Sequence, residues 1–202
     1  MFVQVIRGTV SDREQARAAV ERWVRDLAPG AAGWLGTTAG VTDDGRFVTL
    51  ARFESADAAR RSGDRPEQDA WWSDVSRAFT GEVTVDDSED VVTDVVGDPD
   101  EAGFVQVMSG RATDPRRVRE IMEATSGQVR GFRPEILGSL YVQQDTGDFT
   151  MAIYFTSERE AREGERKEPP PEVAAQMEEL NSLAAGPLEF LNLKDPWLHS
   201  PR

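Results

Sequence analysis

Hydrophobic and polar residues alternate in short segments that recur in the same order in both halves of the chain. Residues 2–8 (FVQVIRG) alternate as a strand does, and residues 16–27 place their apolar members on one face of a helix. Residues 34–41 and 46–53 are strand-like and flank TDDG, which is typical of a hairpin turn. A second helix is predicted from 66 to about 80, and a last strand follows. The order is therefore β-α-β-β-α-β.

A shift of 102 residues aligns the second half of the chain with the first. From Phe2 through Asp64 no gap is needed, and 17 of the 63 aligned pairs are identical. The second copy then gains three residues within ERKEPPPE, so that at an offset of 105 Pro66 aligns with Pro171 and Gly81 with Gly186. A register kept over this length indicates an internal duplication of one small domain.

The β-α-β-β-α-β order is that of the ferredoxin-like split βαβ unit. Its sheet carries helices on one face, and a second copy can cover the other face. We therefore predict an α+β fold of two ferredoxin-like repeats, packed sheet to sheet as a pseudo-dimeric α+β barrel. The predicted boundaries are 1–85 for the first repeat, 86–102 for an acidic linker with a strand extension, and 103–202 for the second repeat with a C-terminal latch.

The linker is acidic but also contains valines at strand-like positions. Residues 82–101 hold nine acidic residues and no basic one, which accounts for most of the net charge of −14. The valines at 91, 92, 95 and 96 predict a strand that crosses to the other half. The C-terminal DPWLHSPR places Trp197 and Leu198 beside prolines and is expected to latch onto the body of the protein.

Composition excludes several classes of function. An acidic chain lacks the clustered lysines and arginines of a nucleic-acid surface. The absence of cysteine removes disulfides and thiolate chemistry, no apolar run is long enough to span a membrane, and no glycine-rich nucleotide motif is present. The acidic run lacks the spacing of a calcium loop and His199 is the only histidine, so we expect no metal site. Strand-like sequence starts at residue 2, so we expect no secretory signal and a cytoplasmic location.

Several segments carry a family resemblance: the opening strand FVQV, the FxS stretch before the second helix, and the Trp71–Trp72 pair. With the element order, they resemble the dimeric α+β barrel superfamily, and within it the antibiotic biosynthesis monooxygenase-like proteins. GFVQVMSGR, YFTSEREAREGE and PPPE are similar to an actinobacterial tandem group, in which two halves mimic a homodimer. The resemblance implies the fold predicted above and functions that range from cofactor-independent oxygenation of phenols to haem degradation.

The haem-degrading branch of this family is marked by an Asn in the first strand, a Trp in the second helix and a His soon after it. Only the Trp can be matched here, at Trp71 or Trp72. No histidine follows either second helix closely, so we expect no haem and no other cofactor.

Aromatic and amide residues of the first half are the strongest candidates for a ligand pocket. The helical stripe of the second copy places Trp72 and Phe79 on the inner face of the second helix, and Trp71 lies about 100° around it. Gln4 and Gln106 occupy equivalent places in the two first strands, among apolar neighbours. The alternative is that the indoles serve packing and that the two amides are satisfied by the backbone or by each other.

The second half offers a polar set around Arg133, Tyr141 and Tyr154. These are weak catalytic candidates, because Tyr and Arg can stabilise negative charge that develops during proton abstraction. Arg162 and Glu165 belong to EREAREGERKE, which is more typical of a solvated helix with ion pairs at i,i+4.

Two functions stay open. The first, slightly favoured, is a cofactor-independent, monooxygenase-like oxygenase that acts on a small aromatic substrate. The second is a non-catalytic small-molecule-binding or structural protein of the same fold. The expected partner is a small aromatic ligand, with neither nucleic acid nor membrane, and further homo-oligomerisation of the intrachain pseudo-dimer stays open.

Overall fold

The computed structural model of the chain describes residues 1–95, 97–125, 131–144 and 146–201. It divides into two compact units, of which the first comprises Met1–Glu89 with Asp195–Arg202 and the second comprises Asp90–Lys194. The C-terminal segment from Asp195, which is predicted above as the latch at the end of the second repeat, therefore belongs to the first unit.

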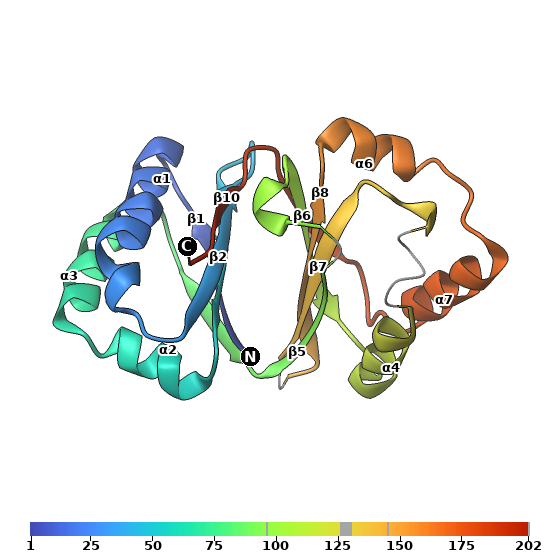
Figure 1. Cartoon of the computed structure of the whole chain (residues 1–202), viewed down its shortest axis with the longest axis horizontal. Coiled ribbons are helices and arrows are strands. Elements are labelled where there is room, and N and C mark those ends of the chain that lie inside the picture. Colours follow the sequence, from blue (N-terminus) through green and yellow to red (C-terminus); the bar gives the residue numbers. More distant parts are fainter. Residues whose placement is uncertain (96, 126–130, 145, 202) are drawn as a thin grey trace. The chain divides into compact units, whose positions relative to one another are not determined.

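The first unit is an antiparallel sheet of five strands with helices on one face (Figure 1). The strand order is β10-β2-β3-β1-β4. Its elements are β1 (Phe2–Thr9), α1 (Arg13–Arg22), β2 (Trp34–Val41), β3 (Arg46–Phe53), α2 (Ala56–Gly63), α3 (Pro66–Val75), β4 (Thr84–Ser88) and β10 (Trp197–His199).

The second unit has the equivalent sheet, in the order β5-β7-β8-β6-β9, also with helices on one face (Figure 1). Its elements are β5 (Asp90–Val95), β6 (Phe104–Arg111), α4 (Pro115–Thr125), β7 (Ile136–Gln143), β8 (Asp148–Phe155), α6 (Glu158–Gly164), α7 (Pro171–Ser182) and β9 (Glu189–Leu193). The predicted α+β fold with two ferredoxin-like repeats is confirmed, whereas the packing of one sheet on the other stays a prediction.

The helices begin where the sequence provides caps. Asp12 accepts a hydrogen bond from the backbone N–H of Gln15 at 3.0 Å, which satisfies one of the free donors of the first turn of α1. The predicted second helix is present as α3, which Pro66 starts, and a separate short helix capped by Ser55, α2, precedes it. The second repeat has the same arrangement, with Ser157 capping α6 and Pro171 starting α7.

Each sheet is completed by a strand that follows the other repeat in the sequence. β5 pairs with β7, and β10 pairs with β2, at equivalent registers: Val92 lies opposite Tyr141, and Trp197 lies opposite Ala39. The predicted crossing valines lie on β5, except Val96, which is outside the described residues.

Both added strands pass close to a glycine. A Cβ at Gly36 would lie 2.7 Å from the carbonyl oxygen of His199, and a Cβ at Gly138 would lie 2.9 Å from that of Asp94. The absence of a side chain at these two positions therefore lets the added strands approach.

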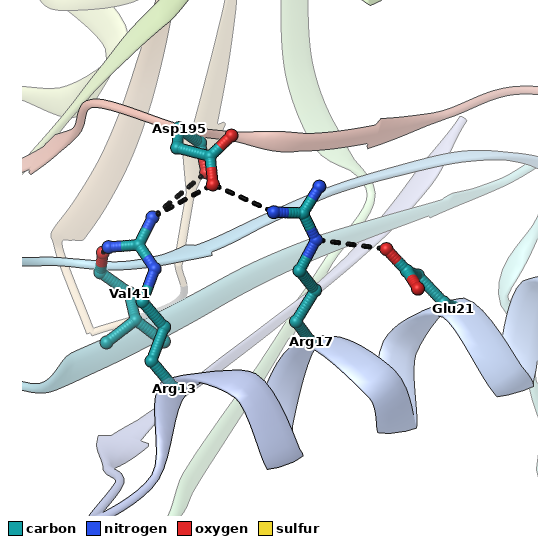
Figure 2. Close-up of polar contacts among 5 residues, drawn as sticks. All are labelled: Arg13, Arg17, Glu21, Val41 and Asp195. Carbon is teal, nitrogen blue, oxygen red and sulfur yellow. Dashed lines mark hydrogen bonds and ion pairs between the residues drawn. The ribbon is translucent and has the colours of Figure 1, made fainter.

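Figure 2 shows how α1 holds the C-terminal segment in the first unit. Asp195 Oδ2 accepts from Arg13 Nη2 at 3.3 Å and from Arg17 Nη1 at 2.9 Å. Arg13 Nη1 also donates to the carbonyl oxygen of Val41 at 3.0 Å, and Glu21 pairs with Arg17 Nε at 3.0 Å. We call this contact the α1–Asp195 clamp.

An equivalent clamp is present in the second unit. Arg119 of α4 pairs with Asp90 at the start of β5, and its Nε lies 2.9 Å from Glu123. Arg119 and Glu123 are the counterparts of Arg17 and Glu21, so the duplication preserved the contacts that hold each added strand.

Among the described residues, no helix is long and apolar enough to cross a membrane. Within the same part of the chain, no group of three or more acidic or histidine side chains is placed to hold a metal ion.

Candidate functional site

A pocket of about 120 Å³, partly open to solvent, lies between the helices and the sheet of the first unit. All of its lining residues belong to that unit. They are Gln4, Ile6, Val20, Trp23, Thr37, Phe47, Thr49, Ala51, Phe53, Ala59, Ser62, Gly63, Gln68, Trp71, Trp72, Val75 and Phe79.

The floor of the pocket is formed by alternate residues of the sheet. β3 contributes every second residue from Phe47 to Phe53, because successive side chains of a strand point to opposite faces. Between its two phenylalanines lie the small residues Thr49 and Ala51, and β1 adds Gln4 beside them, opposite Ala51 in the pairing of the two strands. The small side chains of β3 leave space above the sheet that larger residues would fill.

The wall over this floor is aromatic. The ring centroids of Trp71 and Trp72 are 6.0 Å apart, and Trp72 lies 6.3 Å from Phe79. Phe79 also meets Phe47 edge to face at 5.3 Å. Gly8 of β1 makes room for this wall, because a Cβ there would lie 2.6 Å from the ring of Phe79.

Two of the three indoles that line the pocket donate their N–H groups within the protein. Trp71 Nε1 donates to the carbonyl oxygen of Ala19 at 2.8 Å, and Trp23 Nε1 donates to Gln68 Oε1 at 2.7 Å. The bonds tie α3 to α1 and to the π-helical turn Trp23–Leu27 that follows α1. They fix the orientation of these two indoles, so that a ligand would meet their ring carbons and not their N–H groups.

The polar groups of the pocket are uncharged. They are the amides of Gln4 and Gln68 and the hydroxyls of Thr37, Thr49 and Ser62. Among the described residues that line the pocket, none is acidic, basic, a tyrosine or a histidine. The lining itself therefore offers apolar contact and hydrogen bonds but no group that titrates near neutral pH.

The structure brings together four residues that the sequence predicted as a ligand pocket: Gln4, Trp71, Trp72 and Phe79. Gln106, the fifth, lies in the second unit, where its Nε2 donates to Asn192 Oδ1 at 3.1 Å. It does not line this pocket.

The two tyrosines proposed as catalytic candidates are separated by the second sheet. Tyr141 pairs with Met151, whereas Tyr154 lies three residues further along β8 and points to the opposite face. Both rings are only 2% exposed. Tyr141 donates to Gln143 Oε1 at 2.5 Å, and burial raises its pKa above the ordinary value, with a smaller contribution from Asp90. The two phenols therefore cannot act on one substrate.

Arg133 is committed to a buried ion pair. It contacts Glu135 and donates from Nη2 to the carbonyl oxygen of Ala161 at 3.2 Å. Lys167 Nζ lies 3.9 Å from the same carboxylate, and a side chain at Gly164 would occupy the space that the pair fills. This arrangement neutralises a buried Glu and favours a structural role for Arg133.

Arg162 and Glu165 carry the ion pairs expected of a solvated helix. Arg162 lies 2.8 Å from Glu165 and 3.5 Å from Glu158, and its guanidinium is also 5.3 Å from the centroid of the Phe104 ring.

Several lining residues were not singled out from the sequence. Trp23 and Gln68 form the hydrogen bond that closes one side of the pocket, and Thr49 and Ala51 create its space. The repeat alignment contains the signal for the last two, because Met151 and Ile153 occupy their places in the second copy.

The structure resembles solved structures along almost its whole length. Proteins from Lactobacillus acidophilus and Fusobacterium nucleatum, each named "putative monooxygenase", match with TM-scores of 0.72 and 0.74 at 13% and 11% identity. The matches cover 98% of this chain and 99% and 94% of theirs. The chain has their fold.

An anthrone oxidase-like protein also matches, with a TM-score of 0.69 at 12% identity over 98% of this chain and 92% of that one. No protein-family model matches the sequence, and no curated protein matches it. The resemblance to monooxygenase-like proteins that the sequence predicts is thus confirmed at the level of the fold.

Proposed function

We propose that the first unit binds a small, uncharged aromatic molecule in its pocket. The observation that carries the proposal is the lining: three indoles and three phenyl rings surround a few uncharged hydrogen-bonding groups. Apolar walls with a small number of placed polar groups are typical of small-molecule sites.

The size of the pocket favours a single ring at its centre. An enclosed apolar cavity of about 150 Å³ holds a benzene molecule, and this pocket of about 120 Å³ is partly open, so substituents can extend outward. Burial of about 150 Å² of ligand surface, at about 25 cal/mol per Å², is worth about 4 kcal/mol. Because association also costs the ligand part of its freedom of motion, a one-ring probe is expected to bind with a Kd of about 1 mM or weaker, and hydrogen bonds should strengthen binding.

Cofactor-independent oxygenation is the second candidate, favoured by the names of the proteins that share the fold. In such a reaction the substrate supplies all four electrons: a CH2 group becomes a C=O group, or a phenol becomes a quinone, so that one oxygen atom of O2 enters the product and the other leaves as water with the two hydrogens. The described lining contains no general base. The candidate substrates are therefore phenols or activated methylenes that lose a proton without one.

Titration calorimetry with 4-ethylphenol tests the binding proposal, and oxygen uptake over a panel of phenols tests the second candidate. Trp72→Leu should weaken binding of 4-ethylphenol about tenfold, because it removes an aromatic wall. Met177→Leu is the matched control at the equivalent position of α7 and should leave binding unchanged. Absence of heat with every aromatic probe at millimolar concentration would refute the binding proposal, and oxygen uptake equal to that of buffer would refute oxygenation of the phenols tested.

A further inference from the structure

The amide of Gln4 has one end committed to the protein. Its Nε2 donates to Asp87 Oδ1 on the neighbouring strand β4 at 3.0 Å. Because a carboxylate only accepts hydrogen bonds, this contact fixes the NH2 end toward Asp87. The carbonyl oxygen is the end that remains for a ligand, and it can only accept.

The amide of Gln68 is fixed in the opposite sense. Its Oε1 accepts from Trp23 Nε1 at 2.7 Å, and an indole N–H can only donate. The NH2 group of Gln68 therefore remains for a ligand, and it can only donate. The pocket thus combines one oriented acceptor with one oriented donor, whereas the hydroxyl of Thr49 can serve as either.

The charges around these amides disfavour an anionic ligand. The described lining provides no cation, and the carboxylate of Asp87 on the neighbouring strand lies 3.0 Å from Gln4 Nε2. A phenolate or carboxylate would lose its hydration in this pocket without gaining an opposite charge.

We infer that the pocket selects hydroxyaryl carbonyl compounds in their neutral form: one aromatic ring with a hydroxyl that donates to Gln4 and a carbonyl that accepts from Gln68. This inference rests on the proposed function, since it names the ligand class of the same pocket. A ligand that loses its phenolic proton loses both its donor and its neutrality, so affinity follows the neutral fraction of the ligand.

Four probe molecules distinguish the hydrogen bond to Gln4 from the hydrogen bond to Gln68. The first, 4-hydroxyacetophenone, has both the hydroxyl and the carbonyl. The second, 4-methoxyacetophenone, has only the carbonyl, and the third, 4-ethylphenol, has only the hydroxyl. The fourth, 4-hydroxybenzoate, is an anion. At a pH below the phenol pKa of 4-hydroxyacetophenone, calorimetry should show this probe binding about three- to tenfold more tightly than 4-methoxyacetophenone or 4-ethylphenol, as expected for one added hydrogen bond. Above that pKa its affinity should fall about tenfold per pH unit, and 4-hydroxybenzoate should bind at least tenfold more weakly.

Variants of the two glutamines test which of them binds each group of the ligand. Gln68→Glu keeps the acceptor for Trp23 but removes the donor, and Gln68→Met removes it without adding charge. Both should weaken the two acetophenones about three- to tenfold and leave 4-ethylphenol within about twofold in Gln68→Met. Gln4→Leu should weaken the binding of 4-hydroxyacetophenone and 4-ethylphenol and leave that of 4-methoxyacetophenone unchanged. Gln106→Leu, which loses the equivalent bond to Asn192, is the matched control and should change no affinity.

The possible failures are distinguishable. Equal affinities for all three neutral probes, or tighter binding of the phenolate, would overturn this inference and leave aromatic binding intact. Failure of all four probes to bind would overturn the proposed function and this inference with it.

Discussion

The two units share one fold but place their bulky side chains in opposite layers. On the sheet, Thr49 and Ala51 of the first unit correspond to Met151 and Ile153 of the second. The first sheet therefore has a low floor at this point, and the second has a raised one.

On the helices the difference in side-chain size is reversed, with the larger residues in the first unit. The aromatic residues Trp71, Trp72 and Phe79 of the first unit correspond to Gln176, Met177 and Ala184 of the second. In the second unit flexible methionines and leucines pack with Tyr141 and Phe149 between the layers; they include Met108, Met122, Met151, Leu180, Leu183 and Leu188.

The same backbone therefore accommodates a pocket in the first unit and larger packed side chains at the equivalent sheet positions of the second. In the first unit rigid aromatic rings of the helical wall cover small sheet residues, and space remains between the two layers. In the second unit flexible methionine side chains pack against larger sheet residues. Duplication provided two copies, and under the proposed function a change in side-chain size at a few positions separates a binding half from a structural half.

The added strands show a similar exchange of size. Trp197 of β10 lies opposite Ala39, whereas Val92 of β5 lies opposite Tyr141. A large residue thus meets a small one in both units, but the large one comes from the added strand only in the first. The first unit should therefore depend more strongly on its added strand.

Chromophores report on the two units separately. All five tryptophans lie in the first unit and both tyrosines in the second. Tryptophan emission therefore follows unfolding of the first unit, and tyrosine absorbance follows unfolding of the second.

The largest expected effect is that of Trp197→Ala. The side chain is 3% exposed and packs against Phe47, so its loss should cost about 3–5 kcal/mol of the free energy of unfolding. Urea denaturation followed by tryptophan emission measures it. Val92→Ala, followed by tyrosine absorbance, should cost only about 1 kcal/mol; equal losses would contradict the difference between the two added strands.

Met151→Thr combined with Ile153→Ala should lower the floor of the second unit. We expect a loss of about 2–4 kcal/mol in the stability of that unit, because the surrounding side chains close the new cavity only in part. Tyrosine-detected denaturation measures the loss. An unchanged stability would mean that the second core is not filled by these residues.

Alkaline pH should destabilise the second unit through Tyr141. Its folded-state pKa is raised by burial, so the contribution is fully present below the unfolded-state pKa of about 10 and is lost as pH rises beyond it. The loss should reach at most about 1.4 kcal/mol per pH unit for this group. Denaturation at pH 9, 10 and 11 should show a shallower decline in Tyr141→Phe than in the original protein; parallel declines would argue against a role for Tyr141.

Loss of the α1–Asp195 clamp should have the smallest effect. Asp195→Asn removes partners from two arginines, but all three side chains are partly exposed, so we expect less than about 1 kcal/mol. Asp90→Asn, which removes a partner from one arginine, Arg119, should cost less still. The differences should shrink in high salt, and a cost above 2 kcal/mol for either variant would show that the clamps matter more than their exposure suggests.

The fold follows from the sequence because hydrophobic alternation and duplication are both local, countable signals. The aromatic wall was predicted in the same way, from the helical position of Trp72 and Phe79. The small floor residues Thr49 and Ala51 were not predicted, because a threonine or an alanine indicates a pocket only when the residues that pack over it are known. Tyr141 and Tyr154 were grouped by their strands, and only the register of the β7–β8 hairpin shows that they point to opposite faces.

The central claim is that one unit holds the binding pocket and the other has filled it. Calorimetric titration of 4-hydroxyacetophenone into the original protein and into the double variant Thr49→Met, Ala51→Ile tests this claim most directly, because the variant gives the first unit the floor of the second. We predict one ligand per chain for the original protein and at least tenfold weaker binding for the variant, with its circular dichroism unchanged. Two ligands per chain, or an affinity that survives the raised floor, would contradict it.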